Sequence, residues 1–352
     1  MHHTETVNLN IINPLSDHRW DDLVARHPRA SAFHQRGWLE ALARTYHYKP
    51  FVLTSAPAGK PLNDGIVVCH VASWITGTRL VSLPFADHCD PLLNEGAEVA
   101  EFMVWLRAEC DRRRCRYIEF RPLLAYRDVG YGSQPEGGYC FHELDLTPTL
   151  EQIFRQMHKN SFRRNIRKAE RERLSYEVGN SERLVNEFYR LLMVTRRRHR
   201  VLPQPRAWFR NLVECMGGKV QIRLARKNGS AIAAMLSLRQ GSCAVFKYGC
   251  SDARFHSLGG VPFLFWRLIE ESKTSGAEKI DLGRSDWDNK GLIAFKDRIG
   301  AKRRLLTYYR YTNREGGAME TALGVLGDWK SVFSLPDAVL STAGRIMYKH
   351  MG

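Results

Sequence analysis

The chain has 352 residues, of which 44% are hydrophobic and 11% are aromatic. This length fits two domains of about 150 to 180 residues, each able to bury its own core, so the composition excludes a disordered chain. The longest apolar runs, at 231–238 and 261–269, are shorter than the roughly 20 residues that a membrane-spanning helix needs. The N-terminus MHHTETVNLN lacks the pattern of a secretory signal. We therefore expect a cytoplasmic protein, or one at the inner face of the cytoplasmic membrane.

The net charge of +16 is unevenly distributed. Residues 151–214 hold 16 Lys and Arg against 7 Asp and Glu, which gives this segment a charge of +9. Such a field attracts polyanions, among them RNA, phosphorylated carriers, nucleotide-linked sugars and an anionic membrane face. The eight cysteines form no C-x-x-C pair and no Cys/His ligand spacing, so we expect mostly buried thiols and no metal site.

The first half of the chain alternates short apolar runs with segments of helical periodicity. We expect Ser16 to cap the first helix. The polar loop Pro84–Pro91 carries Asp87 and His88, which either contact an acceptor substrate or form an ordinary turn. The expected elements are a strand at 7–12, helices at 16–25 and 36–45, strands at 50–54, 65–73 and 79–83, a helix at 97–113, and strands at 117–121 and 140–146.

The second half repeats this order of elements. The sequence therefore predicts two α/β domains, at residues 1–146 and 147–317. A helical tail at 318–352 follows, which either docks on the body or touches a membrane surface. The expected elements are a helical region at 147–173, a strand at 174–178, helices at 182–198 and 206–216, strands at 220–226, 231–239 and 243–248, a helix at 259–275, a strand at 279–283, a helix at 292–299 and a strand at 302–312.

The stretch Glu278–Gly300 predicts a strand, a polar loop and a helix that contains Lys296. A rigid strand end that delivers a polar loop is a common way of presenting a site, although an ordinary connection with a solvated lysine has the same pattern. In the loop, Asp286 can hold an acceptor amine and take its proton. Asn289 either contacts the acceptor or caps the next helix, and Arg284 either clamps an anion or pairs with Asp286.

Six segments between residues 33 and 311 form an ordered set. They are HQRGWLEALARTY, VSLPFADHCDPLL, SFRRNIRKAER, YGCSDARFHSLGG, KIDLGRSDWDNKGLIAFKDRIGA and LTYYRY. As a set they resemble the Fem-like family of GNAT-fold acyltransferases of bacterial cell-wall synthesis. The resemblance implies two tandem GNAT-like domains, each a mixed, largely antiparallel sheet flanked by helices. It also implies metal-free transfer of an acyl or aminoacyl group to an amine or hydroxyl of a cell-envelope or polysaccharide precursor.

The resemblance further implies that two strands of the second domain part, and that the donor carbonyl lies between them against a backbone N–H. Here the gap falls between 243–248 and 279–283. Lys296, in a Phe-Lys pair that the family shares, would face the reacting centre. Tyr248 either contacts a substrate or is a buried core tyrosine. The residues implied at the donor are Phe246, Lys247, Arg254, Gly259 and Gly260, the last two opening a helix whose amides meet an anion.

One helix face near Phe162 is strongly basic, and its opposite face is apolar. We call this basic face, defined by Arg163, Arg164, Arg167, Lys168 and Arg171, the basic stripe. It is either a solvated surface or a contact for a polyanion. Two donors remain open: charged tRNA bound by the basic stripe, or an acyl thioester on coenzyme A or a carrier protein. The alternative function is a non-catalytic binder of RNA or anionic membrane on a transferase scaffold.

Overall fold

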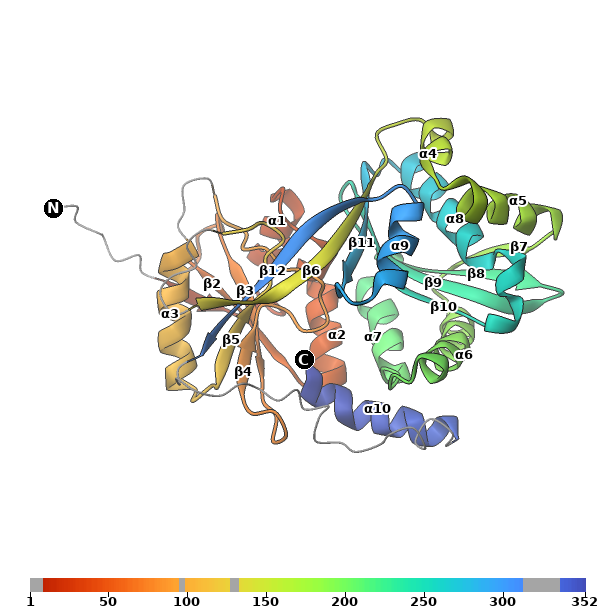
Figure 1. Cartoon of the computed structure of the whole chain (residues 1–352). Coiled ribbons are helices and arrows are strands. Elements are labelled where there is room, and N and C mark those ends of the chain that lie inside the picture. The colour runs from red at the N-terminus through yellow and green to blue at the C-terminus, as the bar shows by residue number, and fades with distance from the viewer. Residues whose placement is uncertain (1–8, 95–98, 127–132, 313–335) are drawn as a thin grey trace. The chain divides into compact units, whose positions relative to one another are not determined.

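The structure is a computed structural model, and it describes residues 9–94, 99–126, 133–312 and 336–352 (Figure 1). The chain forms two compact units. Unit 1 contains Met1–Gly138, Leu306–Gly327 and Ile346–Gly352, and unit 2 contains Tyr139–Leu305 and Asp328–Arg345. These units are groups of residues in mutual contact, so the domain boundaries after 146 and 317 stay predictions.

The strands of unit 1 pair in the order β1-β2-β3-β4-β5-β12 and form a mixed sheet region, in which β12 is Lys302–Thr312. Strands β4 and β5 pair in parallel, and the other pairs described in this unit are antiparallel. The buried face of helix α3 packs against β2, β3 and β5 to form a core. The elements are β1 (Asn10–Ile12), α1 (Arg19–Arg26), the 3-10 turn η1 (Ala32–His34), α2 (Arg36–Tyr46), β2 (Lys49–Thr54), β3 (Ile66–Val71), β4 (Arg79–Val81), α3 (Val99–Arg112) and β5 (Tyr117–Phe120).

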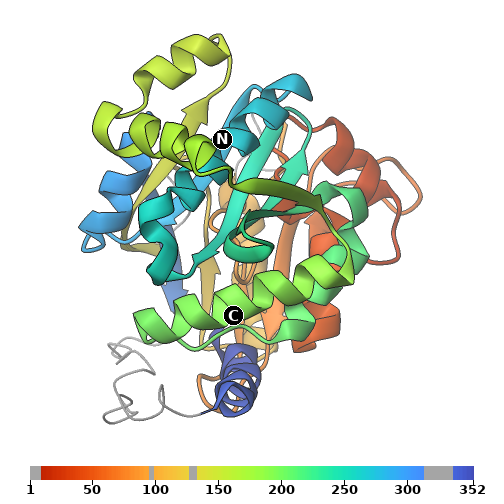
Figure 2. The same ribbon diagram turned by 90° about the vertical axis from the view of Figure 1, so that its right-hand side faces the viewer.

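The strands of unit 2 pair in the order β6-β11-β10-β9-β8-β7 and form a mixed sheet region. Helices α5 and α8 lie on one side of it, and α6 and α7 on the other (Figures 1 and 2). The elements are β6 (Ser133–Asp145), α4 (Leu150–Gln156), the π turn η2 (Lys159–Arg163), α5 (Arg164–Arg171), β7 (Ser175–Gly179), α6 (Glu182–His199), α7 (Arg206–Met216), the 3-10 turn η3 (Gly217–Lys219), β8 (Val220–Lys227), β9 (Ser230–Gln240), β10 (Cys243–Ser251), the 3-10 turn η4 (Ala253–Leu258), α8 (Gly260–Thr274), β11 (Lys279–Ser285) and α9 (Lys290–Arg298). The last helix, α10 (Asp337–Met351), has residues in both units.

The predicted repeat is confirmed. The order β1-α1-α2-β2-β3-β4-α3-β5 in unit 1 corresponds to β7-α6-α7-β8-β9-β10-α8-β11 in unit 2. In each unit, one pair of the repeated strands is parallel, and the two parallel pairs correspond: β4 with β5 and β10 with β11. A parallel pair needs a crossover, and a helix supplies it in both units. The predicted architecture, two repeated units with mixed, largely antiparallel sheet regions flanked by helices, is therefore correct.

The helical region expected at 147–173 is present but interrupted. The chain leaves the helix after Gln156, because Met157 and His158 adopt extended backbone angles with ψ of 144° and 122°. The amide of His158 donates instead to the carbonyl of Arg298 at 2.9 Å. The first helix also differs from expectation, since it begins at Arg19 and Ser16 does not cap it.

The tail was expected to be helical from 318 to 352. Helix α10 covers its last part, while residues 313–335 lie outside the described residues. Its side chains Leu340 and Tyr348 are buried, which confirms docking for this helix. Among the residues that the structure describes, no helix combines the length and apolar character needed to cross a membrane.

Candidate functional site

The parallel pair β10 and β11 separates soon after it begins. Only three residue pairs join the two strands, and the last is Val245 with Asp281. Beyond that point β10 continues to Ser251 paired with β9 alone, and the end of β11 pairs with β6. The inner edges of the two strands therefore no longer bond to each other. This is the parting that the sequence resemblance implies, at the expected place.

A bulge in each strand accompanies the separation. In β10 the register against β9 shifts between Phe246 and Tyr248, which leaves Lys247 as the extra residue. In β11 the register against β6 shifts between Asp281 and Arg284. Gly283, inside this second bulge, has a φ of 70°, and its amide donates to Asp281 Oδ1 at 2.6 Å. Bulges bend a strand and increase its local twist, so these two account for the divergence.

A cavity of about 270 Å³ lies beside β10, at the start of α8. As expected, the glycine pair opens this helix: Gly259 precedes it with a φ of 78°, and Gly260 is its first residue. A Cβ on Gly259 would lie 2.3 Å from the carbonyl oxygen of Asn165, so only glycine fits there. The cavity is lined by Ile232, Ala233, Ser251, Asp252, Phe255, His256, Gly260, Val261, Pro262 and Phe295.

His256 is a polar residue of this cavity for which sequence analysis assigned no role. Its Nε2 lies 2.8 Å from Ser251 Oγ and 3.2 Å from the Arg198 guanidinium. Burial lowers the pKa of His256, and the charge of Arg198 lowers it further. An anion in the cavity would meet the helix start and the Ser251 hydroxyl, although the Asp252 carboxylate also lies in the lining. The contacts join residues of α6, β10 and η4, so no local sequence pattern marks them.

Lys296 lies on α9, and its side chain is buried, with the residue only 3% exposed. Its Nζ donates to the carbonyl oxygens of Gly283 at 2.9 Å and Arg284 at 3.0 Å. The ammonium is thus fixed at the bulge where β11 turns away from β10. The preceding residue, Phe295, lines the cavity and packs against Phe265 with ring centroids 5.4 Å apart. The predicted role of Lys296 at the reacting centre stays a prediction.

A histidine and an aspartate beside Lys296 were missed by sequence reasoning. His142, fully buried on β6, places Nε2 3.2 Å from Asp297 Oδ1 on α9. Asp297 also accepts a hydrogen bond from Arg303 at 2.6 Å, and Arg303 is the main cause that holds the Asp297 pKa low. Burial lowers the pKa of His142 despite this carboxylate. The pair anchors α9 to β6 across 155 sequence positions, a separation at which single-sequence patterns carry no signal.

The loop before α9 exposes Asp286, as its predicted role with an acceptor requires. Asn289 is the N-cap of α9, with Oδ1 accepting from the Leu292 amide at 3.1 Å, so the capping alternative is confirmed. The Arg284 guanidinium stacks 4.1 Å above the Tyr139 ring. The acceptor-binding roles of Arg284 and Asn289 stay predictions.

Tyr248 is buried, with its ring 5.2 Å from that of Phe209 on α7. Its hydroxyl accepts a hydrogen bond from Trp208 Nε1 at 3.0 Å. Phe246 instead packs on Phe265 of α8, at 4.7 Å between ring centroids. The bulge at Lys247 explains why these two residues contact helices of different layers. Tyr248 thus occupies a core position, while its predicted catalytic role and the predicted donor contacts of Phe246 and Lys247 stay predictions.

The basic stripe spans η2 and α5. The apolar face on the opposite side is buried, as expected, through Phe162, Ile166 and Ala169. His158, which the sequence pattern places on the same face, is exposed. Its members Arg164, Arg167 and Arg171 are exposed, and Arg163 and Lys168 are partly buried. Helix α5, which carries part of the basic stripe, packs on η4 and α8, and these two elements contribute residues to the cavity lining. Its predicted contact with a polyanion stays a prediction.

Arg254 is predicted to bind the donor, and it lies in η4 with a side chain that is 80% exposed. It pairs with Asp252 at 2.6 Å, and this hydrogen bond lowers the pKa of Asp252. In unit 1, the Asp87 carbonyl accepts from the Tyr308 hydroxyl at 2.6 Å, and His88 is buried against Phe33. The predicted donor role of Arg254 and the predicted acceptor roles of Asp87 and His88 are not tested by these contacts.

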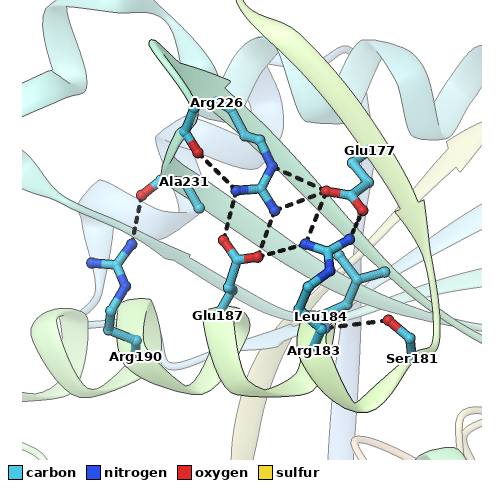
Figure 3. A network of polar contacts seen from close by, with 9 residues as sticks. Glu177, Ser181, Arg183, Leu184, Glu187, Arg190, Arg226 and Ala231 are labelled. Carbon is cyan, nitrogen blue, oxygen red and sulfur yellow. Dashed lines mark hydrogen bonds and ion pairs between the residues drawn. The ribbon is translucent and has the colours of Figure 1, made fainter.

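A network of ion pairs holds the layers of unit 2 together near the cavity (Figure 3). Arg226 of β8 contacts Glu177 of β7 at 2.8 Å and Glu187 of α6 at 2.6 Å. Arg183 of α6 contacts both glutamates as well. Because its two arginines and two glutamates balance in charge, we interpret this network as structural support.

The comparisons with known proteins agree with this geometry. Residues 156–296 match the family model described as Acetyltransferase (GNAT) domain. The matched range runs from the end of α4 through the cavity, the parted strands and Lys296. Unit 2 therefore contains a GNAT acyltransferase domain, and the predicted class of enzyme is confirmed. Among curated proteins, none matches the sequence.

Several solved structures share the fold. The crystal structure of FemX has 12% identity and a TM-score of 0.66, over 86% of this chain and 97% of FemX. The C-terminal domain of a putative lysylphosphatidylglycerol synthetase from Agrobacterium fabrum has 17% identity and a TM-score of 0.56, over 87% and 93%. A tandem GNAT protein from the clavulanic acid biosynthesis pathway has 13% identity and a TM-score of 0.53, over 88% and 100%. The chain therefore shares its fold with FemX and with a tandem GNAT protein.

Proposed function

We propose that this protein moves an acyl or aminoacyl group from an activated donor to an amine or hydroxyl of a cell-envelope or polysaccharide precursor. The parting of β10 and β11 beside the cavity at the start of α8 carries this proposal. The acceptor attacks the donor carbonyl, and the new C–N or C–O bond replaces the C–S or C–O bond to the donor. The acceptor loses its proton, and the leaving thiol or hydroxyl gains one. We place the reaction in the cytoplasm, at the inner face of the membrane.

The attack creates a tetrahedral oxyanion, which needs preorganised donors. Backbone amides of β10 beyond Val245 supply them in this proposal, because β11 no longer pairs with that edge. The Lys296 ammonium adds positive charge at the bulge of β11. Asp286 is exposed and takes the acceptor proton. Tyr248 contributes by holding the bulged strand through Trp208.

Two donor classes fit different parts of the surface. A thioester on coenzyme A or a carrier protein would place its phosphates at the start of α8, near Ser251 and Arg198. A charged tRNA would use the basic stripe, which adjoins that region through the packing of α5 on η4. Lysylphosphatidylglycerol, from which the similar synthetase takes its name, is an aminoacyl ester of a lipid. This similarity supports aminoacyl transfer as well as acyl transfer.

Purification of the protein under low salt tests the donor assignment. Bound nucleic acid that disappears with ribonuclease supports tRNA, whereas calorimetric binding of coenzyme A supports a thioester. Arg164→Glu with Arg167→Glu should abolish RNA retention and leave coenzyme A binding intact. Arg155→Glu is the matched control, because this exposed residue lies on α4, outside the basic stripe. Absence of both ligands would contradict the donor assignment.

A non-catalytic polyanion binder is the second candidate function. It rests on the net charge of +16 and on the three exposed arginines of the basic stripe. It predicts binding with a steep salt dependence and no transfer to any acceptor. A screen of amine and sugar acceptors with acyl and aminoacyl donors separates the two: turnover that requires Lys296 supports the transferase.

A further inference from the structure

Unit 1 exposes a group of large apolar side chains on two segments far apart in the sequence. Trp74 and Ile75, in the turn between β3 and β4, are 84% and 37% exposed. Ile346 and Met351, near the end of α10, are 51% and 44% exposed. Single exposed apolar residues are ordinary on a protein surface. A tryptophan at 84% exposure, next to the exposed Ile75 and on a turn that contacts a helix with two further exposed apolar residues, is not.

The two segments form one surface. The Trp74 and His350 rings lie edge to face, with centroids 5.4 Å apart. Ser73 Oγ lies 2.9 Å from His350 Nδ1, and Thr76 Oγ1 donates to the His350 carbonyl at 2.9 Å. Ile346 lies one helical turn before His350, and Met351 follows it directly. We call these four apolar residues, with the adjacent Arg116 and Lys349, the Trp74 surface.

The Trp74 surface rests on a fixed base. The Arg79 side chain, which is buried, donates to the carbonyls of Gly352 at 2.7 Å and His350 at 2.8 Å. The Tyr48 hydroxyl donates to the carbonyls of Tyr348 and Lys349, each at 3.1 Å. These bonds hold the end of α10 and the turn in place. Trp74 is therefore exposed on an ordered part of the structure.

The two charged residues of the Trp74 surface are both basic. Arg116 donates to the Thr76 carbonyl at 3.4 Å, which places this exposed cation beside the turn. Lys349 is exposed on the last turn of α10. The sequence segments 66–80 and 338–352 contain no Asp or Glu. An indole with aliphatic neighbours and a basic border is the composition that favours the interface of an anionic bilayer.

We propose that the Trp74 surface binds an anionic phospholipid bilayer, with Trp74 and Ile75 among the headgroups and Arg116 and Lys349 against lipid phosphates. Nucleic acid fits less well, because the apolar residues would find no partner along a phosphate backbone. Binding here does not depend on the proposed transfer reaction. It would hold the protein at a surface where lipid-linked acceptors occur.

Vesicle sedimentation with the full chain tests the proposal. We expect binding to vesicles of phosphatidylcholine with phosphatidylglycerol, weak binding to phosphatidylcholine alone, and release by salt. Trp74→Ala should weaken binding roughly tenfold, because it removes a large interfacial side chain. Val104→Ala is the apolar control, since Val104 on α3 is 65% exposed. Arg116→Ala should weaken binding, whereas Arg112→Ala, with a side chain that is 68% exposed, should not.

Two results would overturn the proposal. One is an unchanged vesicle affinity in both Trp74→Ala and the double variant Ile75→Ser with Lys349→Glu. The double variant also keeps the test valid if Trp74→Ala fails to fold. The other is a dimer in sedimentation velocity that Trp74→Ala converts to a monomer, without vesicle binding by either form. That outcome would make the Trp74 surface an interface between copies of the chain. Circular dichroism checks that each variant is folded.

Discussion

Lys296 and Gly283 are joined by a hydrogen bond of 2.9 Å from the buried ammonium to the glycine carbonyl. Gly283 is the residue of β11 whose φ of 70° permits the bulge. The lysine therefore fixes the same distortion that separates β11 from β10. The same ammonium carries the charge proposed for the reaction and makes the contact that holds the strand. Experiments on Lys296 must therefore distinguish an effect on the reaction from an effect on the fold.

Lys296→Ala should lower the transfer rate roughly 100- to 1,000-fold if the ammonium stabilises the oxyanion. It should also lower the free energy of unfolding by about 2 kcal/mol, because two buried carbonyls lose a charged donor. Single-turnover rates and urea unfolding measure the two effects separately. Lys290→Ala is the control, since Lys290 is exposed at the first position of the same helix. A full transfer rate together with reduced stability would assign Lys296 a structural role only.

Gly259→Ala should disrupt the start of α8. Both Gly259 and Gly276 have a positive φ, 78° and 79°, so alanine costs about 1 kcal/mol at either position through the left-handed backbone. Only at Gly259 does the new Cβ approach another atom, the Asn165 carbonyl oxygen at 2.3 Å; nothing lies within 4 Å at Gly276. We expect Gly259→Ala to cost a further 1 to 3 kcal/mol, roughly, and to abolish donor binding.

Gly276→Ala should keep donor binding, which makes it a matched control. Thermal unfolding and coenzyme A or RNA binding of both variants decide the outcome. Equal stability and equal binding would show that the approach of α5 to the start of α8 is looser than the structure indicates.

Much of the fold could be predicted because its signals are local. Asn228 and Gly229, both with positive φ, form the tight turn between β8 and β9 that the Asn-Gly pair predicts. The cap at Asn289 follows from a side chain that reaches an amide three residues on. Such turns and caps, with the apolar periodicity between them, were sufficient to find the repeat.

The rest depends on contacts that no local pattern encodes. The helix expected through Met157 and His158 is broken without a proline or glycine, because the His158 amide bonds to the end of α9. The same is true of the site, where His142 meets Asp297 and His256 meets Arg198 from distant elements. The resemblance placed the gap between the strands, but the polar groups around it were visible only in three dimensions.

His34 should make stability depend on pH. The Ser31 amide donates to its Nδ1 at 3.0 Å, so Nε2 carries the proton and donates to the Asp90 carbonyl at 2.9 Å. This neutral ring is fully buried, and burial lowers its pKa to about 4. The unfolded chain, with a histidine pKa of about 6.5, takes up a proton that the folded protein does not. Stability should therefore fall as the pH drops from about 6.5 to about 4, by roughly 1.4 kcal/mol per pH unit for this residue.

Urea unfolding at several pH values measures this dependence. His34→Gln should be less stable at pH 7 and should show a smaller loss on acidification than the parent. Titration of the His34 ring near pH 6.5 in NMR spectra would contradict the prediction.

Arg226 should be a strong stabilising residue of unit 2, because it neutralises two glutamates on different elements. Its side chain is only 14% exposed, whereas that of Arg183, the other cation of the network, is 58% exposed. Arg226→Met would leave Glu177 and Glu187 close together with less compensation, and we expect a loss of about 3 kcal/mol. Glu187→Gln in that background should restore part of the loss, because it removes one of the two facing charges.

The exposed pair of Arg155 and Glu151 provides the comparison, with side chains 71% and 72% exposed. Arg155→Met should cost less than about 0.5 kcal/mol, since water screens such pairs. Urea unfolding of the three variants and the parent at low and high salt measures the difference. Salt should reduce the Arg226 effect only slightly, because the network is partly buried. Equal costs at positions 226 and 155 would mean that the network adds no more than an ordinary surface pair.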